Sequence, residues 1–143
     1  MLRKASRAVA RAYDEALAPH GMTTAQFAIL RHVARGQPLA LSRLAEELVM
    51  DRSSLYRAIA PIEARGWILT GATGGRTKYA VLTREGAAAM QAAEPDWHGV
   101  QKRIEAELGG VWTGLEFALG AVTRSAERVR TERVGTERTR KAR

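Results

Sequence analysis

Cysteine is absent from this sequence of 143 residues. Disulfide bonds, thiolate nucleophiles, thiol redox sensors and cysteine-based zinc sites are therefore excluded. Long apolar runs are also lacking. The basic residues near the amino terminus are not followed by a continuous hydrophobic segment, which a signal peptide or a membrane span would need. We expect a cytoplasmic protein with no membrane partner.

Catalytic motifs are missing as well. No G-x-S-x-G, H-E-x-x-H, P-loop or dinucleotide fingerprint occurs, and Gly74-Gly75 is interpreted as a turn rather than a phosphate cradle. The three histidines, His20, His32 and His98, form no close pair in the sequence and have no carboxylate beside them at metal-ligand spacing. The pattern argues against an enzyme, a metal site and a cofactor.

Basic residues are in excess. The chain has 23 lysines and arginines and 15 acidic residues, which gives a formal net charge of +8. This balance favours a polyanionic partner, either nucleic acid or an acidic membrane surface. Six basic and two acidic residues lie between Arg130 and Arg143, with almost no apolar residue after Val134. Residues 131–143 are predicted to be a disordered basic tail, either a frayed end or a source of extra phosphate contacts.

The length and the apolar share, 45% of residues, suit one domain with a substantial core. Apolar residues recur at three- and four-residue steps over residues 2–17, which predicts a helix that ends before Gly21. Thr23 and Gln26 form a capping-box signature, so a second helix is predicted from there to Gly36.

The middle of the chain predicts two shorter helices. A brief strand at Leu39 is followed by a poorly capped helix over residues 41–48. After a tight connection, Asp51 is suited to cap a further helix, which contains Pro61 and closes at Gly66.

A hairpin and two long helices are predicted to complete the chain. Two β-prone runs, residues 67–70 and 79–82, flank a glycine-rich basic loop. Thr83 is suited to cap a helix that runs to about Leu108, and after a break at Gly109-Gly110 a last helix carries an apolar stripe over residues 111–129. The apolar surface of this stripe and of the first helix is larger than the small central unit can cover. We expect a second copy to cover this surface, the alternative being that the two stripes contact each other within one chain.

The predicted elements follow the order of a winged helix-turn-helix, which is a short helix, a three-residue turn, a second helix and a cationic hairpin. The major groove of B-DNA admits one α-helix, so the helix that begins at Asp51 is predicted to present its exposed first turns to base edges, with Leu55 and Ile59 anchoring it. The contacts predicted in this helix are Arg52, Ser53, Ser54, Tyr56 and Arg57. Arg57 suits the two acceptors of a guanine, Arg52 suits phosphate, and the two serines suit either.

The hairpin supplies two further predicted contacts. Arg76 lies in a glycine-rich loop and is suited to a narrow minor groove, where negative potential is concentrated. Lys78 is expected to contact phosphate.

These residues together resemble the MarR family of bacterial regulators over roughly residues 5–129. The matching segments are Met22–Leu30, Leu44–Leu48, Asp51–Arg57, Ile62–Ile68 and Leu82–Gly86, and Pro95-Asp96-Trp97 with Gln101 and the Leu108-Gly109 break resemble one branch of the family. The resemblance implies that the helix from Asp51 is the recognition helix and Arg76 the wing-tip arginine. The family usually has an aspartate two residues before that arginine, where it restrains the arginine, and this chain has Gly74 at that position.

The resemblance also implies a homodimer built by the terminal helices, which fits a pseudo-palindromic DNA site. It implies release of DNA when a small aromatic or phenolic molecule binds between the dimer helices and the winged unit. The candidates to line such a cavity are Tyr13, His20, His32, Trp97 and Trp112, although aromatic residues at helical spacing more often belong to a core.

The expected fold is thus mainly α with a small β-hairpin wing. Residues 1–36 and 109–130 are assigned to dimerisation, 37–83 to the DNA-binding unit, and 84–108 to a connecting helix. The expected function is sequence-specific repression of transcription in the bacterial cytoplasm, on the nucleoid. Two alternatives remain open: a non-specific architectural nucleic-acid binder that uses the basic tail, and a winged-helix module that binds protein.

Overall fold

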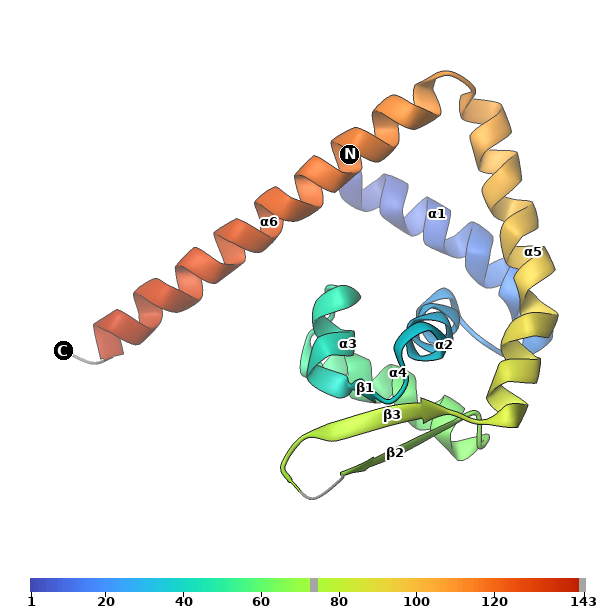
Figure 1. Cartoon of the computed structure of the whole chain (residues 1–143). Helices are drawn as coiled ribbons and strands as arrows, with labels where there is room; N and C mark the ends of the chain where they lie inside the picture. The colour runs from blue at the N-terminus through green and yellow to red at the C-terminus, as the bar shows by residue number, and fades with distance from the viewer. Residues whose placement is uncertain (73–74, 142–143) are drawn as a thin grey trace. The chain divides into compact units, whose positions relative to one another are not determined.

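The computed structural model describes residues 1–72 and 75–141, and for residues 133–141 it describes the backbone alone. The chain divides into two compact units, Met1–Gln101 and Lys102–Arg143, and each is described by itself. Six α-helices and one three-stranded antiparallel sheet are found in the described residues, which confirms the predicted winged-helix architecture (Figure 1).

The first unit opens with two helices joined by a tight turn. Helix α1 spans Leu2–Leu17, the 3-10 helix η1 spans Ala18–His20, and α2 spans Thr24–Gly36. Gly21 ends η1 with a φ of 69°, a left-handed conformation that glycine adopts at little cost. The predicted capping box is confirmed: Gln26 N donates to Thr23 Oγ1 at 3.3 Å, and Thr23 N donates to Gln26 Oε1 at 3.0 Å.

The helix-turn-helix follows as predicted. Strand β1 is Leu39–Ala40, α3 is Leu41–Glu47 and α4 is Arg52–Ala64. The start of α3 has no side-chain cap, as expected with alanine at the capping position, whereas Asp51 caps α4 by accepting from Ser54 N at 2.8 Å.

Strands β2 (Ile68–Ala72) and β3 (Lys78–Leu82) form the wing, and the sheet order is β1-β3-β2. Both strands reach closer to the hairpin tip than the sequence predicted, because Gly71 and Ala72 pair with Tyr79 and Lys78 through backbone hydrogen bonds that do not require β-prone side chains. Trp67, predicted as the first strand residue, lies before β2. Its N–H donates to the Ile62 carbonyl at 2.9 Å and so helps to end α4.

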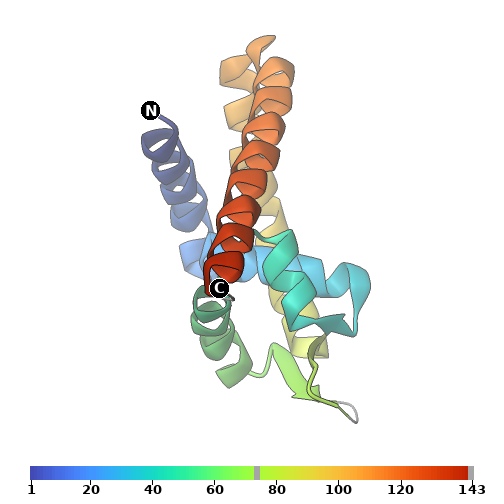
Figure 2. The same cartoon turned by 90° about the vertical axis from the view of Figure 1, so that its left-hand side faces the viewer.

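One apolar core holds α2, α3, α4 and the sheet together. Figures 1 and 2 show α3 and α4 beside the sheet, with the hairpin extending past the helices. The largest fully buried side chains are Leu17, Phe27, Ile29, Leu30, Val33, Leu44, Leu55, Ile59, Ile62 and Ile68. The three buried positions of α4 all lie on the face that meets α2 and β2, so the other face of α4 is left to solvent.

Helix α5 (Arg84–Leu108) begins against the sheet. Thr83 Oγ1 accepts from Gly86 N at 2.9 Å, and this confirms Thr83 as the predicted cap. Gly86 is buried, and a Cβ built on it would lie 1.9 Å from the Trp67 carbonyl oxygen. The first turn of α5 therefore has no room for any side chain at residue 86.

Helix α6 spans Val111–Lys141 and follows a turn in which Gly109 has a φ of 51°. The backbone is helical as far as residue 141, which differs from the disordered tail predicted for residues 131–143, and residues 142–143 of that prediction lie outside the described residues. The sequence after residue 130 contains no proline, and just before it Glu127 and Arg130, which are three residues apart on the helix, form an ion pair at 3.0 Å. Among the described residues, no helix combines the length and the apolar character needed to cross a membrane.

We predict that Gly86→Ala lowers the free energy of unfolding by about 3 kcal/mol, since the new methyl group meets backbone atoms that cannot move aside. Urea unfolding followed by circular dichroism measures the change. Gly99→Ala is the matched control, because residue 99 lies in the same helix with nothing within 4 Å of its built Cβ. That variant should be as stable as the wild type or slightly more stable, and equal stability of the two variants would show that the close approach at Gly86 is wrong.

Candidate nucleic-acid interface

The first two turns of α4 carry the side chains that the sequence assigned to DNA. Arg52, Ser53, Tyr56 and Arg57 are exposed and Ser54 is half-buried. Leu55 and Ile59, on the opposite face, are 1% and 2% exposed. Burial of these two residues fixes the helix against the core, so the polar residues between them necessarily lie at the surface.

Ser54 takes part in the cap of α4 with both its backbone and its side chain. Its N–H donates to Asp51 Oδ1 at 2.8 Å, and its hydroxyl donates to Asp51 Oδ2 at 2.7 Å. The hydroxyl oxygen in turn accepts from Arg57 Nη2 at 3.2 Å. We call these three residues the capping triad. The hydroxyl and amide of Ser54 lower the pKa of Asp51, and the nearby Arg57 charge adds to this effect.

The wing faces the same end of α4. An open hollow between them is lined by Leu41, Ser42, Arg52, Tyr56, Arg76, Thr77 and Lys78. Lys78 Nζ lies 5.8 Å from the centre of the Tyr56 ring, within reach of a weak cation–π contact. Four of the seven predicted DNA contacts thus border one concave surface, to which the structure adds Ser42 and Thr77. No motif in the sequence marked these two residues.

This surface holds three cations, Arg52, Arg76 and Lys78, and Arg57 lies in the second turn of α4. None of the ion pairs between described residues involves Arg52, Arg57, Arg76 or Lys78. The amino-terminal end of α4 adds the partial positive charge of the helix dipole at the same place. An anionic partner fits this surface. Gly74, the departure from the family pattern in the wing, lies outside the described residues.

Two of the predicted ligand-pocket residues come together in an aromatic cluster. Tyr13 and Trp97 stack with ring centroids 5.5 Å apart, and Phe27 lies 5.9 Å from the same indole. The Arg31 guanidinium lies over Trp97 at 4.5 Å, and the Tyr13 hydroxyl donates to Gln101. Tyr13 is buried, so packing between α1, α2 and α5 accounts for both rings without a ligand.

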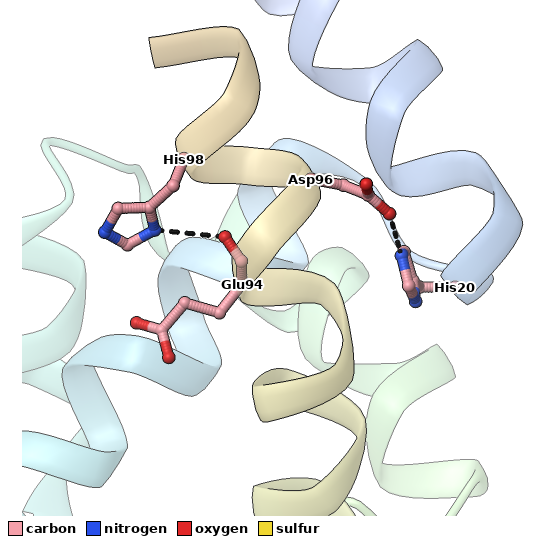
Figure 3. A network of polar contacts seen from close by, with 4 residues as sticks. All are labelled: His20, Glu94, Asp96 and His98. Carbon is pink, nitrogen blue, oxygen red and sulfur yellow. Dashed lines mark hydrogen bonds and ion pairs between the residues drawn. The ribbon is translucent and has the colours of Figure 1, made fainter. Parts of the chain in front are cut away.

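The remaining pocket candidates are dispersed. His20 Nε2 lies 2.6 Å from Asp96 Oδ2, a hydrogen bond across 76 residues that the spacing of the histidines in the sequence did not reveal (Figure 3). His32 Nδ1 contacts the Ala28 carbonyl at 2.8 Å, and the ring borders a separate hollow with Arg35 and Leu39. Trp112 belongs to the second unit and is not placed relative to the others.

Comparison with known proteins identifies the relatives of this chain. The sequence profile of the MarR family matches residues 20–76. An uncharacterised HTH-type transcriptional regulator of Bacillus cereus is 32% identical over 83 residues, which span 58% of this chain and 56% of the relative. The matched segment therefore covers little more than half the length of that curated relative.

Solved structures match over most of the chain. The M. tuberculosis transcriptional regulator MosR is 32% identical, with a TM-score of 0.79 over 89% of this chain and 93% of that chain. MosR in complex with DNA is also 32% identical, with a TM-score of 0.83 over 90% and 95% of the two chains.

A more distant structure shares the fold. CouR from Rhodococcus jostii RHA1, bound to p-coumaroyl-CoA, is 19% identical, with a TM-score of 0.75 over 85% and 87% of the two chains. The family profile, the order of elements and the identity with MosR agree. This chain belongs to the MarR family of winged-helix transcriptional regulators.

Proposed function

We propose that this regulator is a repressor that binds a specific sequence of double-stranded DNA through α4 and the wing. The observation that carries the proposal is the hollow between α4 and β3, where Arg52, Tyr56, Arg76 and Lys78 gather and none of the three cations has an ion pair with a described residue. The similarity to MosR, which has been solved with DNA, supports DNA as the partner of this chain.

The length and the chemistry of each exposed side chain assign it to a base, a phosphate or the minor groove. Arg57, in the second turn of α4, contacts a guanine in the major groove through its two-pronged guanidinium, and Ser53 contacts a base edge or phosphate beside it. Arg52 and Lys78 contact phosphates on either side of the hollow, with Tyr56 between them. Arg76 enters the adjacent minor groove from the wing.

The active form is a homodimer. Large apolar side chains remain exposed on both terminal helices: Leu2 and Val9 on α1, and Val111, Leu119, Val122 and Val129 on one stripe of α6. A second copy removes this apolar surface from water and supplies a second recognition helix. The dimer then binds two half-sites of a pseudo-palindrome, on the nucleoid in the bacterial cytoplasm.

A small aromatic effector controls this dimer by preferring a spacing of the two recognition helices that differs from the DNA-bound one. The support is the cluster of Tyr13 and Trp97 at the junction of α1, α2 and α5, together with CouR, a family fold solved with an aromatic acyl-CoA. Because Tyr13 is already buried, the effector has to separate the two stacked rings in order to enter.

We predict that Arg57→Ala weakens binding to the preferred duplex by about 1–3 kcal/mol and leaves binding to random duplex almost unchanged, since a base contact is lost and phosphate contacts remain. Fluorescence anisotropy with a duplex that the wild type selects from a random pool, and with a random duplex of equal length, measures both values. Equal losses on the two duplexes would favour a non-specific architectural protein. Binding without salt dependence to either would favour a protein-interaction module.

We predict that Leu119→Glu converts the dimer into monomers at micromolar concentration, because a carboxylate is placed in the apolar stripe of α6. Light scattering should give twice the chain mass of 15.6 kDa for the wild type and the chain mass for the variant. Thr113→Glu adds the same charge to the same helix roughly 120° away from residue 119 and should stay dimeric. A monomeric wild type would contradict the proposed assembly.

A further inference from the structure

We propose that Ser54 is a positioning residue for Arg57 and does not itself read the DNA. This inference rests on the proposed function, because it concerns how the recognition helix achieves its specificity. It differs from the expectation drawn from the sequence, in which both serines of the first turn contact bases or phosphates. The capping triad of Asp51, Ser54 and Arg57 carries it.

The hydrogen bonds of the triad run in one direction. A serine hydroxyl has one proton, and that of Ser54 is donated to Asp51 Oδ2 at 2.7 Å. The hydroxyl oxygen accepts from Arg57 Nη2 at 3.2 Å. The single proton of the hydroxyl is therefore committed within the helix, and Ser54 has none left to donate to a base or a phosphate.

The charges of the triad strengthen this arrangement. The Asp51 carboxylate polarises the hydroxyl so that its oxygen is a better acceptor, and Arg57 supplies the cation. Arg57 is exposed, and an exposed arginine otherwise moves among many rotamers. The triad holds its guanidinium by one nitrogen beside the first turn of α4, which lowers the ordering cost when the side chain contacts DNA.

Ser53 supplies the contrast that makes the inference testable. Its side chain is exposed, and no hydrogen bond of its hydroxyl is found among the described residues. Ser53 is therefore free to donate its hydroxyl proton to DNA, whereas the neighbouring Ser54 is not. The two hydroxyls should respond differently when Arg57 is removed, because a positioning residue has no effect without the side chain that it positions.

The experiment is a double-mutant cycle, read as affinity for the selected duplex and for a random duplex. We expect Ser54→Ala to weaken binding to the selected duplex about 3-fold to 10-fold, the loss that follows from ordering one long side chain on binding. In the Arg57→Ala background the same change should have an effect of less than about 2-fold. Ser54→Thr, which keeps the hydroxyl, should restore wild-type affinity, and Ser53→Ala should cause the same loss in both backgrounds.

A second variant separates positioning from helix stability. Asp51→Asn keeps an acceptor for the Ser54 amide, so α4 stays capped, but it places an NH₂ group where the hydroxyl proton was accepted. Loss of the negative charge should raise affinity for random duplex, while the preference for the selected duplex falls. Ser125→Ala, which removes a similar Ser–Arg contact at 3.1 Å in α6, is the control and should leave both affinities unchanged.

The outcomes distinguish this inference from the proposed function. A wild type that selects no duplex overturns the proposed function. A wild type that binds selectively, with Ser54→Ala and Arg57→Ala additive in the cycle, overturns the role of Ser54 alone. Absence of any loss on Ser54→Ala, or full preference retained in Asp51→Asn, overturns it as well.

Discussion

The proposed DNA-binding surface depends on the anchoring of one face of α4. Leu55, Ile59 and Ile62 are almost fully buried against α2 and β2, so the helix has a single allowed orientation about its own axis. That orientation decides which side chains reach solvent. Arg52, Tyr56 and Arg57 are exposed because the core takes the opposite face of the helix.

The two ends of α4 are fixed by different chemistry. At the amino-terminal end, Asp51 places a negative charge on a surface that otherwise gathers cations. This cap is compatible with an anionic partner because its carboxylate is occupied by the amide and hydroxyl of Ser54. At the carboxyl-terminal end, Arg65 donates to the Gly21 carbonyl and lies over Trp67 at 4.9 Å, which ties the end of α4 to the turn after α1. The end of α4 is therefore in direct contact with the turn after α1.

Most of the fold followed from local signals in the sequence. Thr23, Asp51 and Thr83 each precede a helix, and the structure places a cap at each, since capping depends on a few neighbouring residues. The sequence was less informative where distant segments decide the outcome. The full length of β2 and β3 depends on pairing across the hairpin, and the helical backbone after residue 130 depends on charge spacing that also suits a disordered tail.

The candidate site also combines features that local sequence reveals with features that only the folded structure reveals. The exposed residues of α4 and the wing could be identified from the order of elements, because burial of a periodic apolar face leaves the remaining positions outside. The role of Ser54 could not, because the commitment of its hydroxyl is a matter of rotamers rather than of residue type. The His20–Asp96 pair likewise joins residues that only the packing of α5 against the turn after α1 brings together.

Methylation interference on the selected duplex tests the central claim most directly, namely that α4 occupies the major groove while the wing occupies the minor groove. Methylation of guanine N7 blocks major-groove contacts, and methylation of adenine N3 blocks minor-groove contacts. The account predicts that each of two symmetric half-sites contains guanines whose methylation abolishes binding, flanked by adenines with the same effect on the outer side. Binding that tolerates methylation at every guanine N7 would contradict it.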